Sequence, residues 1–183
     1  MPDSTPAELG FGDGLDRLAA RGTQFLGSRV PVLGGAMSWV SERNLVSAIS
    51  GAGGFGVIAA GSMTPAALDT EIRATQALTA APFGVNLITF HPDLAALIDV
   101  CLALGVGHIV LAGGMPGGAI MRQAKAGARV ICFASALPIA RRLVRMGADA
   151  LVIEGSEAGG HIGPVSLGVL AQEILPEIRE VPV

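Results

Sequence analysis

The sequence has 183 residues, a formal net charge of −3, 51% hydrophobic residues and 15% charged residues. This composition is that of a folded chain rather than a disordered one, and it offers no basic stripe for the phosphates of a nucleic acid. The acidic first residues have neither the basic start nor the apolar run of a signal peptide, so we expect a cytoplasmic protein.

Residues 100–121 contain no charged side chain, which raises the question of a membrane span. Repeated glycines and Pro116 interrupt this stretch too often for a stable helix in lipid. We therefore interpret it as a helix end, a buried strand and a loop, and expect no membrane partner.

Short apolar runs recur along the chain about every 20–30 residues, the length of a βα unit in a parallel sheet. They predict strands at residues 30–33, 55–60, 83–89, 108–112, 129–134 and 150–154. Helices are predicted between and after them, at residues 42–50, 65–78, 92–104, 138–146 and 165–179. Thr64 and Pro65 are a typical cap and first residue for the second of these helices.

An α/β chain of this kind folds as a doubly wound sheet or as a βα barrel. Gly51, Gly53 and Gly56 have the G-x-G-x-x-G spacing of a dinucleotide site, but they precede a strand instead of following one. The glycine-rich and polar loops come after the strands, where a βα barrel gathers its active site on one rim. The pattern therefore favours a barrel with parallel strands.

The predicted barrel is incomplete. Six βα units are followed by residues 181–183, which indicate the start of a seventh strand, whereas an eight-stranded barrel takes about 250 residues. An open sheet would leave two unpaired edges, so we expect either a longer natural chain or a second chain that completes the barrel. We interpret residues 1–25 as an N-terminal extension and residues 26–183 as the barrel domain.

Among the three histidines, His161 is the candidate for catalysis. It lies in EGSEAGGHIG, where the glycines let the backbone approach a ligand, and an imidazole can serve as acid, base or donor near neutral pH. His108 opens a strand at the opposite end of the barrel and His91 enters a helix, so structural roles are expected for both. Glu154 and Glu157 lie nearby, but no second histidine has the spacing of a metal site, and no metal is predicted.

Three long motifs carry a family resemblance: PVLGGAMSWVSERNLVSAISGAGGFGVIAAG, then APFGVN, then GADALVIEGSEAGGHIG. In their order and spacing they resemble the nitronate monooxygenases, also called 2-nitropropane dioxygenases. They resemble equally the flavin-dependent enoyl-acyl-carrier-protein reductases. The resemblance covers residues 26–183 and implies a (β/α)8 barrel of the TIM type that binds FMN at its carboxyl rim.

The resemblance also implies roles for individual residues. His161 matches the catalytic histidine of the family. The residues that match flavin-binding positions are Gly35, Ala36, Met37, Asn86, Glu154, Ala158 and Gly160. Two departures stand out: Phe133, Ala134 and Ser135 replace a flavin-contacting lysine, and Ile162 follows the histidine where nitronate oxidisers commonly have proline.

Three functions remain open from the sequence. The leading one is an FMN-dependent monooxygenase that oxidises alkyl nitronates with O2 to carbonyl compounds and nitrite. The second is an enoyl-acyl-carrier-protein reductase that uses FMN and NAD(P)H. The third is a non-catalytic fragment or subunit of a split barrel, since the family's phosphate-binding loops follow strands seven and eight. The expected partners are a small-molecule substrate and a second copy or a second chain.

Overall fold

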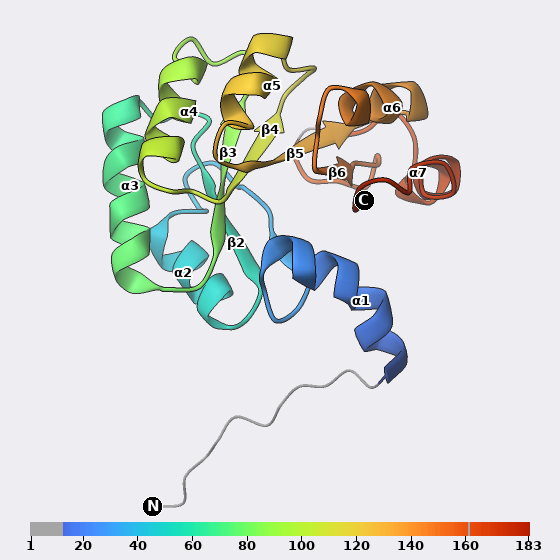
Figure 1. Ribbon diagram of the computed structural model, residues 1–183, viewed down its shortest axis with the longest axis horizontal. Helices are drawn as coiled ribbons and strands as arrows, with labels where there is room; N and C mark the ends of the chain where they lie inside the picture. Colours follow the sequence, from blue (N-terminus) through green and yellow to red (C-terminus); the bar gives the residue numbers. More distant parts are fainter. Residues whose placement is uncertain (1–12, 161) are drawn as a thin grey trace, which may run out of the picture.

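The computed structural model describes residues 13–160 and 162–183 and contains a curled sheet of six parallel strands flanked by helices (Figure 1). The strands lie in the sheet in chain order. They are β1 Leu33–Gly34, β2 Phe55–Ala59, β3 Phe83–Ile88, β4 His108–Ala112, β5 Arg129–Ala134 and β6 Ala150–Ile153. Parallel neighbours in unbroken chain order are the arrangement of a TIM barrel, so the predicted incomplete barrel is confirmed.

The five predicted helices are found, and two further helices, at residues 13–26 and 118–124, were not predicted. The helices are α1 Asp13–Leu26, α2 Arg43–Gly51, α3 Pro65–Leu78, α4 Leu94–Ala103, α5 Gly118–Ala124, α6 Leu137–Arg145 and α7 Leu167–Ile174. The cap of α3 is confirmed, because Thr64 Oγ1 accepts a hydrogen bond from the Ala67 N–H at 3.3 Å. Within the described ranges, no helix has both the length and the apolar character needed to cross a bilayer.

The first strand is shorter and later than predicted, at Leu33–Gly34 instead of residues 30–33. The chain does run beside β2 from Val30 onward, because the Val30 N–H donates to the Gly53 carbonyl and the Phe55 N–H to the Val32 carbonyl. Pro31 lies between these contacts, and a proline has no N–H to give to the ladder. A continuous strand therefore begins only after it.

The two faces of the sheet are both apolar, which is typical of parallel strands covered on each side. On the outer face, Val85 and Leu87 are fully buried beneath the helices. On the inner face, a smaller cluster forms from Leu26, Phe55, Val57, Val110, Ile131 and Ala150. Because side chains alternate along a strand, each strand sends every second residue into the barrel.

Helix α1 covers the amino end of the barrel. Its Phe25 carbonyl accepts from His108 Nε2 at 2.9 Å and from the Arg129 guanidinium, and the His108 ring lies edge-on between Phe25 and Phe55. The structural role expected for His108 is thus confirmed. Helix α1 ends at Leu26 and packs against the barrel, so it runs across the boundary predicted between the extension, residues 1–25, and the barrel domain.

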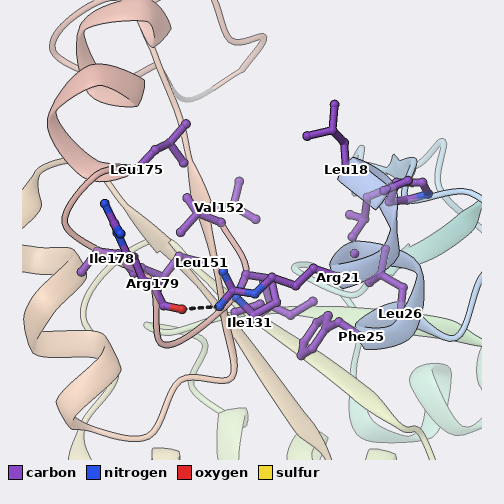
Figure 2. A pocket seen from close by; sticks show the side chains of 17 residues that line it. Leu18, Arg21, Phe25, Leu26, Ile131, Leu151, Val152, Leu175, Ile178 and Arg179 are labelled. Carbon is purple, nitrogen blue, oxygen red and sulfur yellow. Dashed lines mark hydrogen bonds between the residues drawn. The ribbon is translucent and has the colours of Figure 1, made fainter. Parts of the chain in front are cut away.

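The sheet is open between β1 and β6, and a groove of about 480 Å³ lies in the opening. Figure 2 shows Leu18 and Phe25 of α1 on one side of it and Val152 and Leu175 on the other. The predicted seventh strand at residues 181–183 is not formed as a strand. It does lie beside β6, because the Leu151 N–H donates to the Pro182 carbonyl at 2.9 Å. We call this opening the closure groove.

Candidate functional site

The turn after β1 is held by one buried hydroxyl. Ser41 Oγ accepts from the Met37 N–H at 2.9 Å and donates to the Gly35 carbonyl at 3.0 Å, and Ser41 is only 4% exposed. The Ser41 carbonyl in turn accepts from the Ala59 N–H of β2 at 3.0 Å. The 35–41 turn is therefore tied both to itself and to the sheet. Because the Met37 N–H is already bonded, Met37 could contact a ligand through its exposed side chain rather than its amide.

Ala36, in the same turn, packs against the inner cluster of the barrel together with Phe133 and Val152. Val152 lies two residues before Glu154. The inner cluster thus connects the turn after β1 with the end of β6, although the two are distant in sequence. These contacts bring two of the three predicted flavin-binding segments to one side of the sheet.

Asn86 provides the third segment. It lies in β3, where the adjacent Val85 and Leu87 face the outer core. A side-chain carbon built on Gly84 would lie 3.0 Å from the Phe55 ring, so Gly84 and, two residues on, Asn86 face the barrel interior. Asn86 is 8% exposed, and its side-chain amide has no hydrogen-bond partner among the described residues.

The chain after β6 folds back tightly on the strand end. The Gly163 N–H donates to the Gly155 carbonyl at 3.0 Å and the Ser156 N–H to the Val165 carbonyl at 2.8 Å. A side-chain carbon on Gly163 would lie 1.9 Å from the Glu154 carbonyl oxygen, so the close approach requires glycine at this position. The half-buried Glu154 and Ala158 therefore belong to one compact loop.

His161 lies outside the described residues, so its predicted catalytic role is not tested by the structure. Its neighbours Gly160 and Ile162 are exposed, and Gly160 has a φ of +81°. These neighbours belong to the same compact loop as Glu154 and Ala158.

Other polar residues near the rim have structural partners. Glu157 Oε2 accepts from the Leu167 N–H at 2.8 Å at the start of α7, and His91 Nδ1 accepts from the Asp93 N–H at 3.1 Å. Burial raises the pKa of the Cys101 and Cys132 thiols to about 12, so neither is a nucleophile near neutral pH. Residues 13–160 and 162–183 contain no cluster of three metal-ligating side chains.

The role of Ser41 was not predicted from the sequence. Its importance depends on the path of the turn, which brings the hydroxyl within reach of backbone groups four and six residues earlier. The local signal is weak: a hydroxyl residue at the end of a glycine-rich turn can bond to nearby backbone. Many serines in loops fit that description.

The closure groove does not coincide with this rim. It is lined by residues of α1, by Pro31 and Leu33, by β5 and β6, and by the C-terminal segment. Arg21 crosses it and donates to the Arg179 carbonyl at 2.6 Å (Figure 2). The groove thus marks the gap in the barrel wall, and the predicted flavin-binding residues lie elsewhere.

Comparison with known proteins connects this fold to flavoenzymes. The chain is 35% identical over 162 residues to (3aS,4S,5R,7aS)-5-hydroxy-7a-methyl-1-oxo-octahydro-1H-indene-4-carboxyl-CoA dehydrogenase of Mycobacterium tuberculosis, covering 88% of this chain and 46% of that protein. The structure of FabK from Thermotoga maritima superposes with a TM-score of 0.84 at 36% identity, covering 88% of this chain and 52% of that one. Nitroalkane oxidase from Streptomyces ansochromogenes superposes with a TM-score of 0.78 at 25% identity, covering 88% and 59%.

The chain spans about half the length of these relatives. The family profile named Nitronate monooxygenase matches residues 20–100 and 95–183, which together include nearly all of the barrel. These matches confirm both the predicted family and its closeness to FMN-dependent enoyl-acyl-carrier-protein reductases. The chain therefore belongs to the nitronate monooxygenase family of flavin-dependent oxidoreductases.

Proposed function

We propose that this chain forms the flavin-facing part of an FMN-dependent oxidoreductase. The observation that carries the proposal is the Asn86 amide, which faces the barrel interior, makes no hydrogen bond with the described residues and stays accessible from the rim. Because the amide has a free donor and a free acceptor, it can bond a ligand without giving up a hydrogen bond to the protein. The residues proposed to hold FMN are Gly35, Ala36, Met37, Asn86, Glu154, Ala158 and Gly160.

In this proposal the protein positions the flavin and the substrate. Bound FMN supplies the redox chemistry that no side chain here can perform. The 35–41 turn, fixed by Ser41, gives a flat ring a rigid surface, and the Asn86 amide both donates and accepts hydrogen bonds. Glu154 accepts from polar groups of the ligand. His161, for which the resemblance implies catalysis, orients the substrate oxygen and holds or releases the proton.

For the substrate, an enoyl thioester is favoured over a nitronate, which reverses the order given by the sequence alone. The relatives at 35–36% identity include an enzyme named for a CoA ester, whereas the nitroalkane oxidase is 25% identical. Ile162 also favours a thioester substrate, because it follows His161 where nitronate oxidisers commonly have proline. The proposed reaction is hydride delivery to the carbon β to the thioester carbonyl, with NAD(P)H as the electron source.

Oxidation of alkyl nitronates is the second candidate, supported by the family profile and by the nitroalkane oxidase match. One pair of assays separates the two on protein purified with FMN. Anaerobic NAD(P)H that bleaches the flavin absorbance, followed by recolouring with crotonyl-CoA, supports thioester reduction. Oxygen consumption and nitrite release with propionate-3-nitronate, without pyridine nucleotide, would support the nitronate reaction instead.

The closure groove indicates where the barrel would be completed. The edges of β1 and β6 are both available for further strands in the described chain, and Pro182 already begins to pair with β6. We propose that additional polypeptide, continuous with this chain or separate from it, completes the barrel and the flavin phosphate site. Flavin that remains bound to the isolated 183-residue chain through gel filtration would contradict this part of the proposal. A cytoplasmic location stays a prediction.

A further inference from the structure

Trp39 has an unusual backbone conformation and an unusual exposure. It is the only tryptophan in the sequence, and its side chain is 86% exposed. Its φ of +66° makes it the one non-glycine residue with positive φ among residues 13–160 and 162–183. The left-handed region is unfavourable for a bulky residue, and outliers of this kind gather at functional sites.

The conformation of Trp39 is imposed from both sides. On one side, the Met37 N–H donates to Ser41 Oγ; on the other, the Ser41 N–H donates to the Met37 carbonyl at 2.8 Å. The Ser41 carbonyl is anchored to β2 through the Ala59 N–H. These bonds close a loop around Trp39, and all of them would form equally well with glycine at that position.

The fold does not require an indole here. A side chain that is 86% exposed contributes little packing, and glycine would adopt the positive φ without strain. A large apolar side chain kept at a strained, exposed position suggests a role in binding. Met37 and Val40, each 52% exposed, place two more apolar side chains on the same turn.

The position of the turn indicates what this surface meets. Gly35, Ala36 and Met37 precede Trp39 directly and are the residues proposed to line the flavin ring. A substrate that reacts at a flavin held by these residues would lie next to this turn. An indole and two aliphatic side chains provide a rigid apolar surface that suits a hydrocarbon chain or ring better than a small polar ion.

We propose that Trp39 is a specificity-determining residue that contacts the apolar acyl group of the thioester substrate. This inference rests on the proposed thioester function, and it adds that bulky or long acyl groups are preferred over short ones. Trp39 acts through binding and takes no part in proton or hydride transfer. Its contact with the acyl group is expected to lower KM and leave kcat nearly unchanged.

Intrinsic fluorescence tests the contact, because Trp39 is the only indole in this chain, and the same titration of Trp39→Phe identifies any emission that other polypeptide contributes. The flavin-loaded protein is titrated with saturated octanoyl-CoA, which cannot be reduced, and with CoA alone. A blue shift or quenching with octanoyl-CoA and none with CoA supports the proposal. Two results would overturn it: equal responses to both ligands, or a blue-shifted emission before any ligand is added, which would mean that other polypeptide covers the indole.

Variant kinetics provide the second test. Trp39→Gly removes the indole and suits the positive φ, Trp39→Phe keeps an aromatic ring, and Leu78→Ala removes an equally apolar exposed side chain at the end of α3. We expect Trp39→Gly to raise KM for an eight-carbon enoyl-CoA about tenfold and to leave KM for crotonyl-CoA unchanged. The KM of Trp39→Phe for the eight-carbon substrate should lie between those of the wild type and Trp39→Gly. The KM of Leu78→Ala should equal that of the wild type.

Equal changes for short and long substrates in Trp39→Gly would refute the role in specificity. If the wild-type protein reduces no enoyl thioester at all, the proposed function fails, and the fluorescence titration still decides whether Trp39 binds an acyl group. The two failures are therefore distinguishable.

Discussion

His108 Nε2 donates to the Phe25 carbonyl oxygen at 2.9 Å, so an inward-facing side chain of the sheet holds the last turn of α1. A carbonyl near a helix C-terminus has no partner within its own helix, and this contact supplies one. Arg129 donates to the same oxygen. The amino end of the barrel is thus closed by a helix attached through its final carbonyl groups.

The first prediction concerns pH. Burial, with a smaller contribution from Arg129, lowers the pKa of His108 below its ordinary value, although Phe25 and Asp149 oppose the shift. The unfolded chain therefore binds a proton at higher pH than the folded one, and the folded state loses stability as pH falls below about 6.5. We expect His108→Gln to show a weaker loss of unfolding free energy between about pH 7 and pH 5.5. Urea unfolding at both pH values measures this change in unfolding free energy. A variant with the same pH dependence as the wild type would contradict the prediction.

The second prediction concerns Ser41. Replacing it with alanine removes two hydrogen bonds of the 35–41 turn, which together are worth about 1–3 kcal/mol. We expect weaker FMN binding and a lower Tm, with flavin affinity reduced more than the stability loss explains. Ser47→Ala is the matched control, because the Ser47 hydroxyl bonds only to the Asn44 carbonyl on the surface of α2. Wild-type flavin affinity in Ser41→Ala would show that the turn does not position the ring.

How far the sequence predicts this fold depends on whether the causes are local. Helix α3 is predicted at its observed bounds because Thr64 and Pro65 define its start within a few residues. Strands β2 to β6 likewise lie within one residue of the predicted apolar runs at each end. These features depend on neighbours in sequence, so a pattern is enough to find them.

Features that depend on how the chain folds back on itself were not predicted. Residues 13–26 look like part of a polar extension, yet they form α1, which is held by His108 and Arg129 more than 80 residues away. The hydroxyl of Ser41 becomes important only once the turn has brought Gly35 and Met37 around it. A single sequence carries no signal for the contacts of α1 and only a weak one for the Ser41 hydroxyl.

The third prediction concerns Asn86. Because its amide has no partner among the described residues, Asn86→Leu should leave the unfolding free energy of the flavin-free protein unchanged or slightly raised. Flavin affinity should fall about tenfold, which corresponds to one lost hydrogen bond of about 1.4 kcal/mol. Flavin titration and urea unfolding on the same samples measure both quantities. A large loss of stability without flavin would show that the amide serves the fold instead of the ligand.

The last prediction concerns the loop after β6, and it uses two glycines four residues apart. A side-chain carbon on Gly163 would lie 1.9 Å from the Glu154 carbonyl oxygen, whereas one on Gly159 has open space within 4 Å. Gly163→Ala must therefore push the loop away from the strand end, taking Glu154 and Ala158 out of place, while Gly159→Ala fits as it stands. We expect Gly163→Ala to lower flavin affinity at least tenfold, and Gly159→Ala to bind flavin as the wild type does. Similar affinities in the two variants would mean that the fold of this loop does not control the flavin site.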